Sequence, residues 1–234
     1  MQIALASAAA GMIAAGGLCG APWGVPLALW TLAGGAGTVL LVLSGRRLFR
    51  DARGLPVASP GLANGLTLLR LVWTAPVCVL LDHGAYDGAL GLYALLVLSD
   101  VLDGIVARAR RETSVFGVVM DPLADVISTF AVFTVFMVDN LVPLWLYLLL
   151  ASRYAMLLLG SAILSVAAGP VAYRATIPGK VVGVVQAAGA AALMWGARAG
   201  GLEPGPASAV FAVLGLGFAS IVVSQGVIGW RHLR

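Results

Sequence analysis

Long apolar runs constrain this chain more than any other feature of its sequence. A membrane-spanning helix needs roughly 20 mostly apolar residues, and such runs follow one another along the chain. Hydrophobic residues make up 61% of the 234 residues and charged residues 10%, whereas soluble domains are about 45–50% apolar and about 25% charged. We therefore predict an all-α integral membrane protein. The predicted membrane helices span residues 2–19, 25–44, 62–82, 88–108, 115–138, 141–168, 178–197 and 206–229.

A basic linker divides the predicted helices into two groups. Residues 1–44 are expected to hold two hydrophobic helices, and the first of them lacks the basic start of a signal peptide, so we expect it to be retained. Residues 45–61 are expected to form the linker. Residues 62–234 are expected to form a membrane domain of six helices.

Basic residues predict the orientation of the chain. If the chain has eight membrane helices, nearly all of the basic residues fall on one side of the membrane. The positive-inside rule predicts that this side is cytoplasmic. We expect a multi-pass protein of the cell (inner) membrane. Nucleic acid is not expected as a partner, because the basic residues lie between apolar runs rather than on a polar face. These residues are Arg46, Arg47, Arg50, Arg53, Arg108, Arg110, Arg111, Arg174, Lys180, Arg231 and Arg234.

Four aspartates gather near the predicted cytoplasmic ends of two neighbouring helices. Asp100 and Asp103 are three residues apart, and Asp121 and Asp125 are four apart, so each pair lies on one helical face. A short connection makes the two helices antiparallel neighbours, and the four carboxylates can converge. Such a cluster would repel itself. Hard divalent cations would relieve that repulsion, which indicates a two-metal centre holding Mg²⁺ or Mn²⁺.

Small residues and one arginine accompany the aspartates. Gly104, Ala107 and Gly117 carry little or no side chain, so a ligand could approach the backbone beside them. Arg108 offers a planar fork of donors that suits phosphate oxygens. Metals, a phosphate-binding arginine and room for a flat group indicate transfer of a phosphoryl-type group at a site facing the cytoplasm.

The same stretch resembles the signature of the CDP-alcohol phosphotransferases, D-x2-D-G-x2-A-R-x8-G-x3-D-x3-D, with every spacing met. The resemblance covers about residues 60–230 and implies a six-helix membrane core, two divalent cations held by the aspartates, and a CDP-linked lipid as donor. It also implies that the last aspartate activates the acceptor hydroxyl, which attacks the β-phosphorus as CMP leaves. The signature positions are Asp100, Asp103, Gly104, Ala107, Arg108, Gly117, Asp121 and Asp125.

Roles at the nucleotide follow from this resemblance. Within the signature it places Asp100, Gly104, Ala107, Arg108 and Gly117 at the nucleotide. A second run, "NGLTLLR", is similar to an N-x-x-T-x-x-R run of the family. That similarity adds two residues to the nucleotide site, Asn64 and Thr67, and gives no role to the arginine that ends the run, Arg70. Asn64 could equally cap a helix.

A third run bears on the acceptor. "PGKVVGVVQ" is similar to a G-K-x-x-T-x-x-Q run, with Gly183 where the family often has threonine. Lys180 and the intramembrane Arg153 are candidates for binding the phosphate of the acceptor. Lys180 could instead anchor the topology at the start of a helix. Arg153 could instead snorkel to the membrane surface or pair two helices.

The acceptor itself is predicted from "MDPLAD". This run is similar to the DP-x-AD of phosphatidylglycerophosphate synthases, although Val126 stands where those enzymes often have lysine. We expect transfer of a phosphatidyl group from CDP-diacylglycerol to glycerol 3-phosphate. An inositol phosphate, or phosphatidylglycerol as in a cardiolipin-type reaction, stays open as acceptor. The resemblance also suggests a homodimer in the lipid bilayer.

Three other interpretations of the aspartates fit the sequence less well. A cation transporter would spread its acidic groups across the bilayer, whereas these four lie in one cytoplasmic layer. A non-catalytic scaffold would not need the complete signature. A purely structural ion-pair network would not need the accompanying glycine and alanine, and ionisable groups within a membrane are usually functional.

Overall fold

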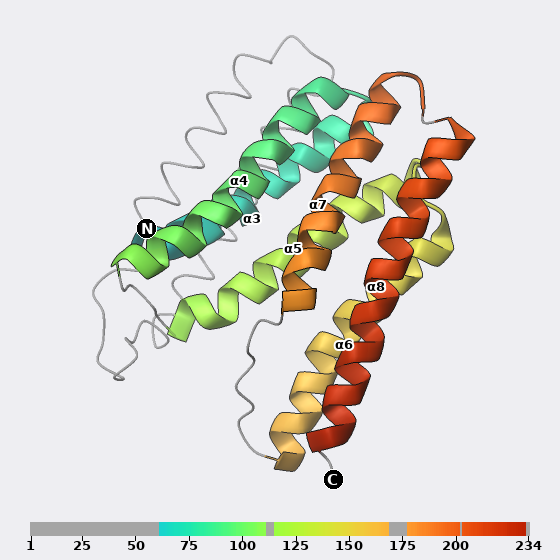
Figure 1. The fold of residues 1–234 in the computed structure, drawn as a ribbon. Helices are drawn as coiled ribbons and strands as arrows, with labels where there is room; N and C mark the ends of the chain where they lie inside the picture. The colour runs from blue at the N-terminus through green and yellow to red at the C-terminus, as the bar shows by residue number, and fades with distance from the viewer. Residues whose placement is uncertain (1–60, 111–114, 169–176, 202, 233–234) are drawn as a thin grey trace. The chain divides into compact units, whose positions relative to one another are not determined.

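The computed structural model describes residues 61–110, 115–168, 177–201 and 203–232, with side chains over 65–102, 120–157, 159, 179–201 and 203–225. These residues form helices and turns, with no strand among them. The two helices predicted within residues 1–44 and the linker at 45–60 lie outside the described part. The helices are α3 (Gly61–Asp82), α4 (Tyr86–Arg110), α5 (Val115–Val138), α6 (Leu144–Ala168), α7 (Ile177–Arg198) and α8 (Pro204–His232) (Figure 1).

Each of the six helices matches one predicted apolar segment, which confirms the all-α prediction over the described residues. The largest differences in boundary are at α6, which begins at Leu144 rather than near 141, and at α8, which ends at His232 rather than near 229. Asn140 has a positive φ of 59°, a left-handed conformation that interrupts the chain after α5. Pro143 then supplies the first turn, since its carbonyl accepts hydrogen bonds from the backbone N–H groups of Leu146 and Tyr147.

Four described helices are long and apolar enough to cross a membrane. The qualifying stretches are Gly65–Asp82, Met120–Val138, Gly179–Arg198 and Pro204–Gln225. Large apolar side chains are also exposed on these helices, among them Leu216, whose exposed fraction is 73%. Lipid rather than water is the natural surrounding for such a surface. The chain is therefore an α-helical, multi-pass membrane protein.

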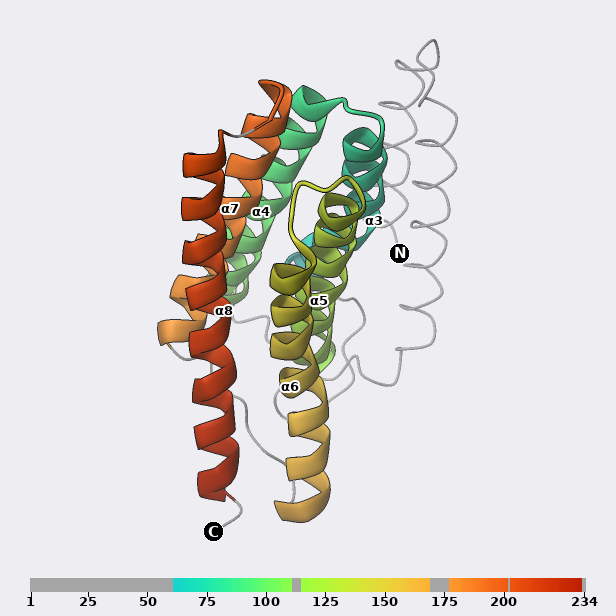
Figure 2. The same ribbon diagram turned by 90° about the vertical axis from the view of Figure 1, so that its right-hand side faces the viewer.

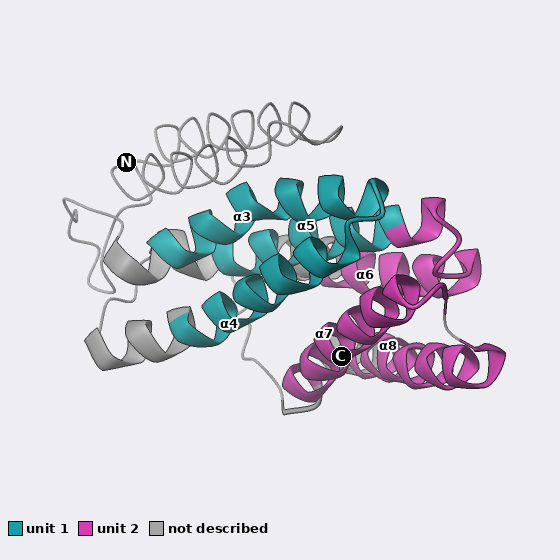
Figure 3. Ribbon diagram, turned by 90° about the horizontal axis from the view of Figure 1, so that it is seen from above, with its two compact units in different colours: residues 1–135 teal, residues 136–234 magenta. Residues whose placement is uncertain are grey.

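The chain divides into two compact units, Met1–Val135 and Phe136–Arg234 (Figure 3). Helices α3 and α4 and most of α5 belong to the first unit. The last turn of α5, with α6, α7 and α8, belongs to the second.

In the first unit, α3 packs along α4 after a tight turn. Gly84 enables this turn with a φ of 69°, and its N–H donates to the carbonyl of Leu81 at 2.9 Å. Only glycine adopts this left-handed conformation without a steric cost, which is why it commonly follows a helix. The turn makes α4 antiparallel to α3.

Two polar contacts join α3 to α5. The Thr67 hydroxyl donates to Asp121 Oδ1 at 2.7 Å, and the hydroxyls of Thr74 and Ser128 lie 2.8 Å apart. Within each pair, the two partners are 54 residues apart in the sequence. A constant separation over two helical turns means that α3 and α5 run parallel and in register.

In the second unit, α8 packs against both α6 and α7. Figures 1 and 2 show α6 and α8 side by side and running in the same direction. Glycines permit close packing here. A Cβ atom added at Gly189 of α7 would lie 2.8 Å from Leu214 Cδ2 of α8, and one at Gly215 of α8 would lie 3.1 Å from the Trp145 ring of α6.

Candidate active site

Three helices of the first unit bring polar side chains together. From α3, Thr67 donates its hydroxyl hydrogen to Asp121 of α5 at 2.7 Å. One turn further along α3, Arg70 Nη2 lies 2.5 Å from Asp100 Oδ1 of α4. Positions three residues apart lie on the same helical face. Helix α3 thus contacts one carboxylate on α5 through Thr67 and one carboxylate on α4 through Arg70.

The ion pair between Arg70 and Asp100 is asymmetric. The Arg70 side chain is 6% exposed, and the Asp100 side chain is 60% exposed. A buried guanidinium stays charged and needs acceptors for its hydrogen bonds. Asp100 satisfies part of that need from the surface of the unit, where its carboxylate remains accessible to a ligand.

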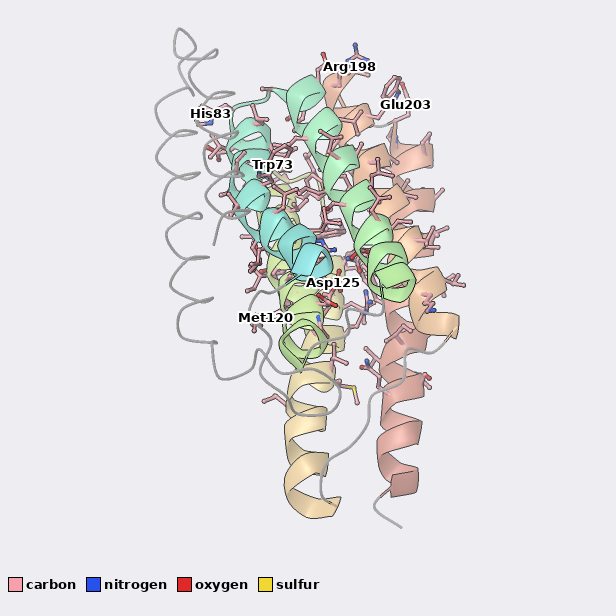
Figure 4. All side chains as sticks on the ribbon, turned by 90° about the vertical axis from the view of Figure 1, so that its left-hand side faces the viewer. Trp73, His83, Met120, Asp125, Arg198 and Glu203 are labelled. Atoms are coloured by element: carbon pink, nitrogen blue, oxygen red, sulfur yellow. The ribbon has the colours of Figure 1, made fainter. Side chains whose placement is uncertain are left out.

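Because Thr67 and Arg70 lie one turn apart on α3, the carboxylates of Asp121 and Asp100 that they contact lie near each other. The local site therefore combines carboxylates from α4 and α5 with one guanidinium from α3. Asp125, labelled in Figure 4, follows Asp121 by one turn on α5. Its side chain is exposed. Carboxylate oxygens are the ligands that Mg²⁺ and Mn²⁺ prefer, so the chemistry of these donors fits a hard divalent cation.

Several predicted site residues have side chains outside the described part. These are Asn64, Asp103, Gly104, Ala107, Arg108 and Gly117. Over the side chains that are described, no group of three or more His, Cys, Asp or Glu residues is arranged to hold a metal ion. The four-aspartate, two-metal centre therefore stays a prediction.

A second polar cluster lies in the other unit, around Arg153 of α6. Its Nη1 donates a hydrogen bond to Gln186 Oε1 of α7. Its guanidinium carbon lies 4.9 Å from the centre of the Tyr154 ring and 5.7 Å from that of the Phe218 ring on α8. Gln186 is buried, and its amide nitrogen lies 3.4 Å from the Tyr154 hydroxyl. One guanidinium thus contacts side chains from all three helices of this unit.

The partners of Arg153 are uncharged. Within the part of the chain whose side chains are described, no carboxylate lies within ion-pair distance of it. Cation–π contacts and an amide oxygen stabilise a guanidinium without cancelling its charge. The cluster is consequently suited to an anion. Lys180, the other predicted acceptor residue, is exposed in the first turn of α7.

Arg70 and Gln186 were given no role from the sequence, although both stand in runs quoted above. Helical spacing was the available signal. Arg70 follows Thr67 by three residues within an otherwise apolar helix, and an arginine there needs a partner. Gln186 is a polar residue in the middle of the apolar α7. Their partners are on other helices, which spacing within one helix does not reveal.

Comparison with known proteins gives a consistent result. Residues 61–224 match the family model described as CDP-alcohol phosphatidyltransferase. The chain is 35% identical over 100 residues to the CDP-diacylglycerol–glycerol-3-phosphate 3-phosphatidyltransferase of Aquifex aeolicus, a match that covers 42% of this chain and 56% of the relative. A protein of the same name from Treponema pallidum is 39% identical over 62 residues, which is 26% of this chain and 29% of the relative.

A relative with a different name also matches. The human cardiolipin synthase (CMP-forming) is 32% identical over 96 residues, which is 41% of this chain and 32% of the relative. The matched segments thus span about half or less of the length of these curated relatives. No solved structure matches the chain.

Proposed function

This chain belongs to the CDP-alcohol phosphatidyltransferase family, and from that premise we propose that it transfers a phosphatidyl group from CDP-diacylglycerol to glycerol 3-phosphate. The observation that carries the proposal is the gathering of Asp100 and Asp121 by Arg70 and Thr67, within the segment that matches the family. The names of the Aquifex and Treponema relatives support glycerol 3-phosphate as the acceptor.

Members of this family generally use divalent cations. We assign Asp100, Asp103, Asp121 and Asp125 as the residues that would hold two Mg²⁺ or Mn²⁺ ions. Such ions neutralise a pyrophosphate and polarise its phosphorus–oxygen bonds. Asn64, Gly104, Ala107, Arg108 and Gly117 are assigned to the nucleotide on the strength of the family resemblance.

Thr67 is assigned a second role beside the expected one at the nucleotide. Its side chain is buried, with the residue 1% exposed, and its hydroxyl is directed at Asp121. In this position Thr67 is proposed to orient the carboxylate, and its contact with the nucleotide stays a prediction. Partners of this kind around a metal ligand typically change metal affinity or activity about 10- to 100-fold.

Asp125 is proposed as the general base. Its exposed carboxylate stands one turn from Asp121 and is accessible to an acceptor. It takes the proton of the acceptor hydroxyl while that oxygen bonds to the phosphorus that carries diacylglycerol. The bond from this phosphorus to the oxygen of CMP breaks, and CMP leaves with the electron pair.

Arg153 is proposed to bind the phosphate of the acceptor, with Lys180 as a second cation. Among the described side chains, its guanidinium contacts Gln186 and the rings of Tyr154 and Phe218 but no carboxylate. A guanidinium fork fits phosphate oxygens well. Glycerol 3-phosphate carries such a phosphate, whereas a simple neutral alcohol does not.

The site is proposed to lie on the cytoplasmic side of the inner membrane, as the distribution of basic residues predicts. CDP-diacylglycerol would then reach it partly from the bilayer and partly from water. Assembly as a homodimer stays a prediction from the resemblance.

One assay tests the proposal. Full-length protein in phosphatidylcholine vesicles would receive CDP-diacylglycerol, Mn²⁺ and, separately, glycerol 3-phosphate, inositol phosphate or phosphatidylglycerol. We expect CMP release with glycerol 3-phosphate, and loss of that release in Asp125→Asn. Release only with phosphatidylglycerol would instead support the cardiolipin-type reaction left open by the sequence and would change the acceptor assignment. Absence of CMP release with every acceptor would contradict the enzymatic function.

A further inference from the structure

The transfer reaction alone does not explain why an arginine, Arg70, is buried in the first unit. We propose that Arg70 is an internal counter-cation of the carboxylate site, which holds Asp100 when divalent cations are absent and releases it when they bind. The inference rests on the proposed function, because that function brings divalent cations to these carboxylates.

Burial fixes which partner can move. Arg70 is buried within the first unit, so its charged end cannot turn to water without disrupting the packing of α3. Asp100 is 60% exposed and its carboxylate can be reached from outside. An incoming cation can therefore take an oxygen of Asp100, whereas it cannot displace Arg70 from its position on α3.

Charge explains why such a residue is needed. Asp100 and Asp121 are held by Arg70 and Thr67, which lie one turn apart on α3, so their two negative charges lie near each other and repel. Arg70 is close to both carboxylates and offsets that repulsion when no metal is bound. Without it, the metal-free site would hold negative charges on α4 and α5, and among the described side chains the Thr67 hydroxyl would still donate to Asp121.

The same contact opposes metal binding. Arg70 Nη2 lies 2.5 Å from Asp100 Oδ1, in the space that a ligand of that oxygen would use. A Mg²⁺ ion needs its oxygen ligands at about 2.0–2.1 Å. The guanidinium must therefore yield this oxygen, and the positive charge that remains nearby weakens the attraction for a second cation. Binding becomes an exchange of one cation for another at Asp100.

A purely structural tether would behave differently. Removal of a tether lowers the stability of the protein by the same amount with and without metal, and it leaves metal affinity unchanged or lower. Removal of a counter-cation lowers stability mainly in the metal-free protein, and it raises metal affinity.

The test compares full-length wild-type protein with Arg70→Met and Arg70→Lys in detergent. Mn²⁺ binding is followed by the electron paramagnetic resonance signal of free Mn²⁺, and melting temperature is measured in EDTA and in Mn²⁺. No substrate is added. Arg198→Met is the control, because it removes one positive charge at the end of α7, where Arg198 lies over Trp195 in the other unit.

For Arg70→Met we expect a lower melting temperature in EDTA, recovery of most of that loss in Mn²⁺, and a Kd for Mn²⁺ lowered about fivefold or more, since a nearby charge is removed. Arg70→Lys keeps the charge but loses the fork, so its Kd should fall less. Arg198→Met should bind Mn²⁺ as the wild type does.

An unchanged or higher Kd in Arg70→Met overturns the inference. If that variant does not fold even in Mn²⁺, an Arg70→Lys variant that binds Mn²⁺ no better than the wild type overturns it. Absence of Mn²⁺ binding to the wild type also overturns it, and CMP release measured in the same preparation reports separately whether the proposed function stands.

Discussion

Thr67 of α3 and Asp121 of α5 are joined by a hydrogen bond of 2.7 Å, and Thr74 and Ser128 form an equivalent contact two helical turns away at 2.8 Å. The first contact involves a proposed metal ligand, and the second does not. The two threonines therefore separate an effect on the site from an effect on the interface between the same helices.

Thr67→Val is expected to lower CMP release about 10- to 100-fold, because the valine cannot donate to the Asp121 carboxylate. Stability should fall by about 1 kcal/mol, the usual contribution of one such hydrogen bond. Thr74→Val is the matched control and should lose similar stability with CMP release nearly intact. Equal activity losses in the two variants, measured as kcat for CMP release, would show that the hydroxyl acts only on the interface.

Gln186→Glu is expected to raise the KM for glycerol 3-phosphate at least about tenfold, a change of about 1.4 kcal/mol. The new carboxylate would lie beside Arg153 and form an ion pair with its guanidinium. The acceptor phosphate would then compete with this carboxylate for Arg153. The KM for CDP-diacylglycerol should stay the same. Gln186→Met removes the hydrogen bond without adding a charge and should have a much smaller effect. Steady-state kinetics with each substrate varied would reveal the opposite pattern if Arg153 served the donor.

Removal of divalent cations by EDTA is expected to stop CMP release, and added Mn²⁺ should restore it. Asp100→Asn should lower release more than about 100-fold, because even outer partners of a bound metal are worth about 10- to 100-fold. Asp82→Asn is the control, since Asp82 is an exposed carboxylate at the opposite end of α3. Full release in EDTA would exclude metal-dependent transfer.

Gly189→Ala is expected to destabilise the second unit by about 1–3 kcal/mol, the usual range for overpacking. The added Cβ would lie 2.8 Å from Leu214 Cδ2 and 3.0 Å from its Cγ, so Leu214 must change rotamer. Gly183→Ala on the same helix meets nothing within 4 Å and should leave the melting temperature unchanged or slightly higher. Thermal unfolding of the two variants under identical conditions measures the difference.

Hydropathy predicted six described helices because one physical requirement, the shielding of backbone polar groups from lipid, acts on every residue of a spanning segment. The start of α6 was missed because hydropathy does not detect a left-handed residue, and Leu141 and Val142 are as apolar as the helix that follows. A proline at position 143 was the available signal.

The candidate site was only partly predictable. Helical spacing placed Asp121 and Asp125 on one face of α5, since that relation depends on a single helix. The pairing of Arg70 with Asp100 depends on how α3 packs on α4, and the contact of Arg153 with Gln186 depends on α6 and α7. Such contacts between helices are set by tertiary packing, which one sequence without homologues does not specify.

The constant separation of 54 residues between the partners on α3 and α5 also defines where the chain tolerates a change of length. One inserted residue turns the rest of a helix by about 100°. An insertion between Asp121 and Ser128 would therefore keep one of the two contacts only by breaking the other. Length variation among related chains should avoid these two turns of α5 and their counterpart from Thr67 to Thr74, and should gather instead in the turns between helices.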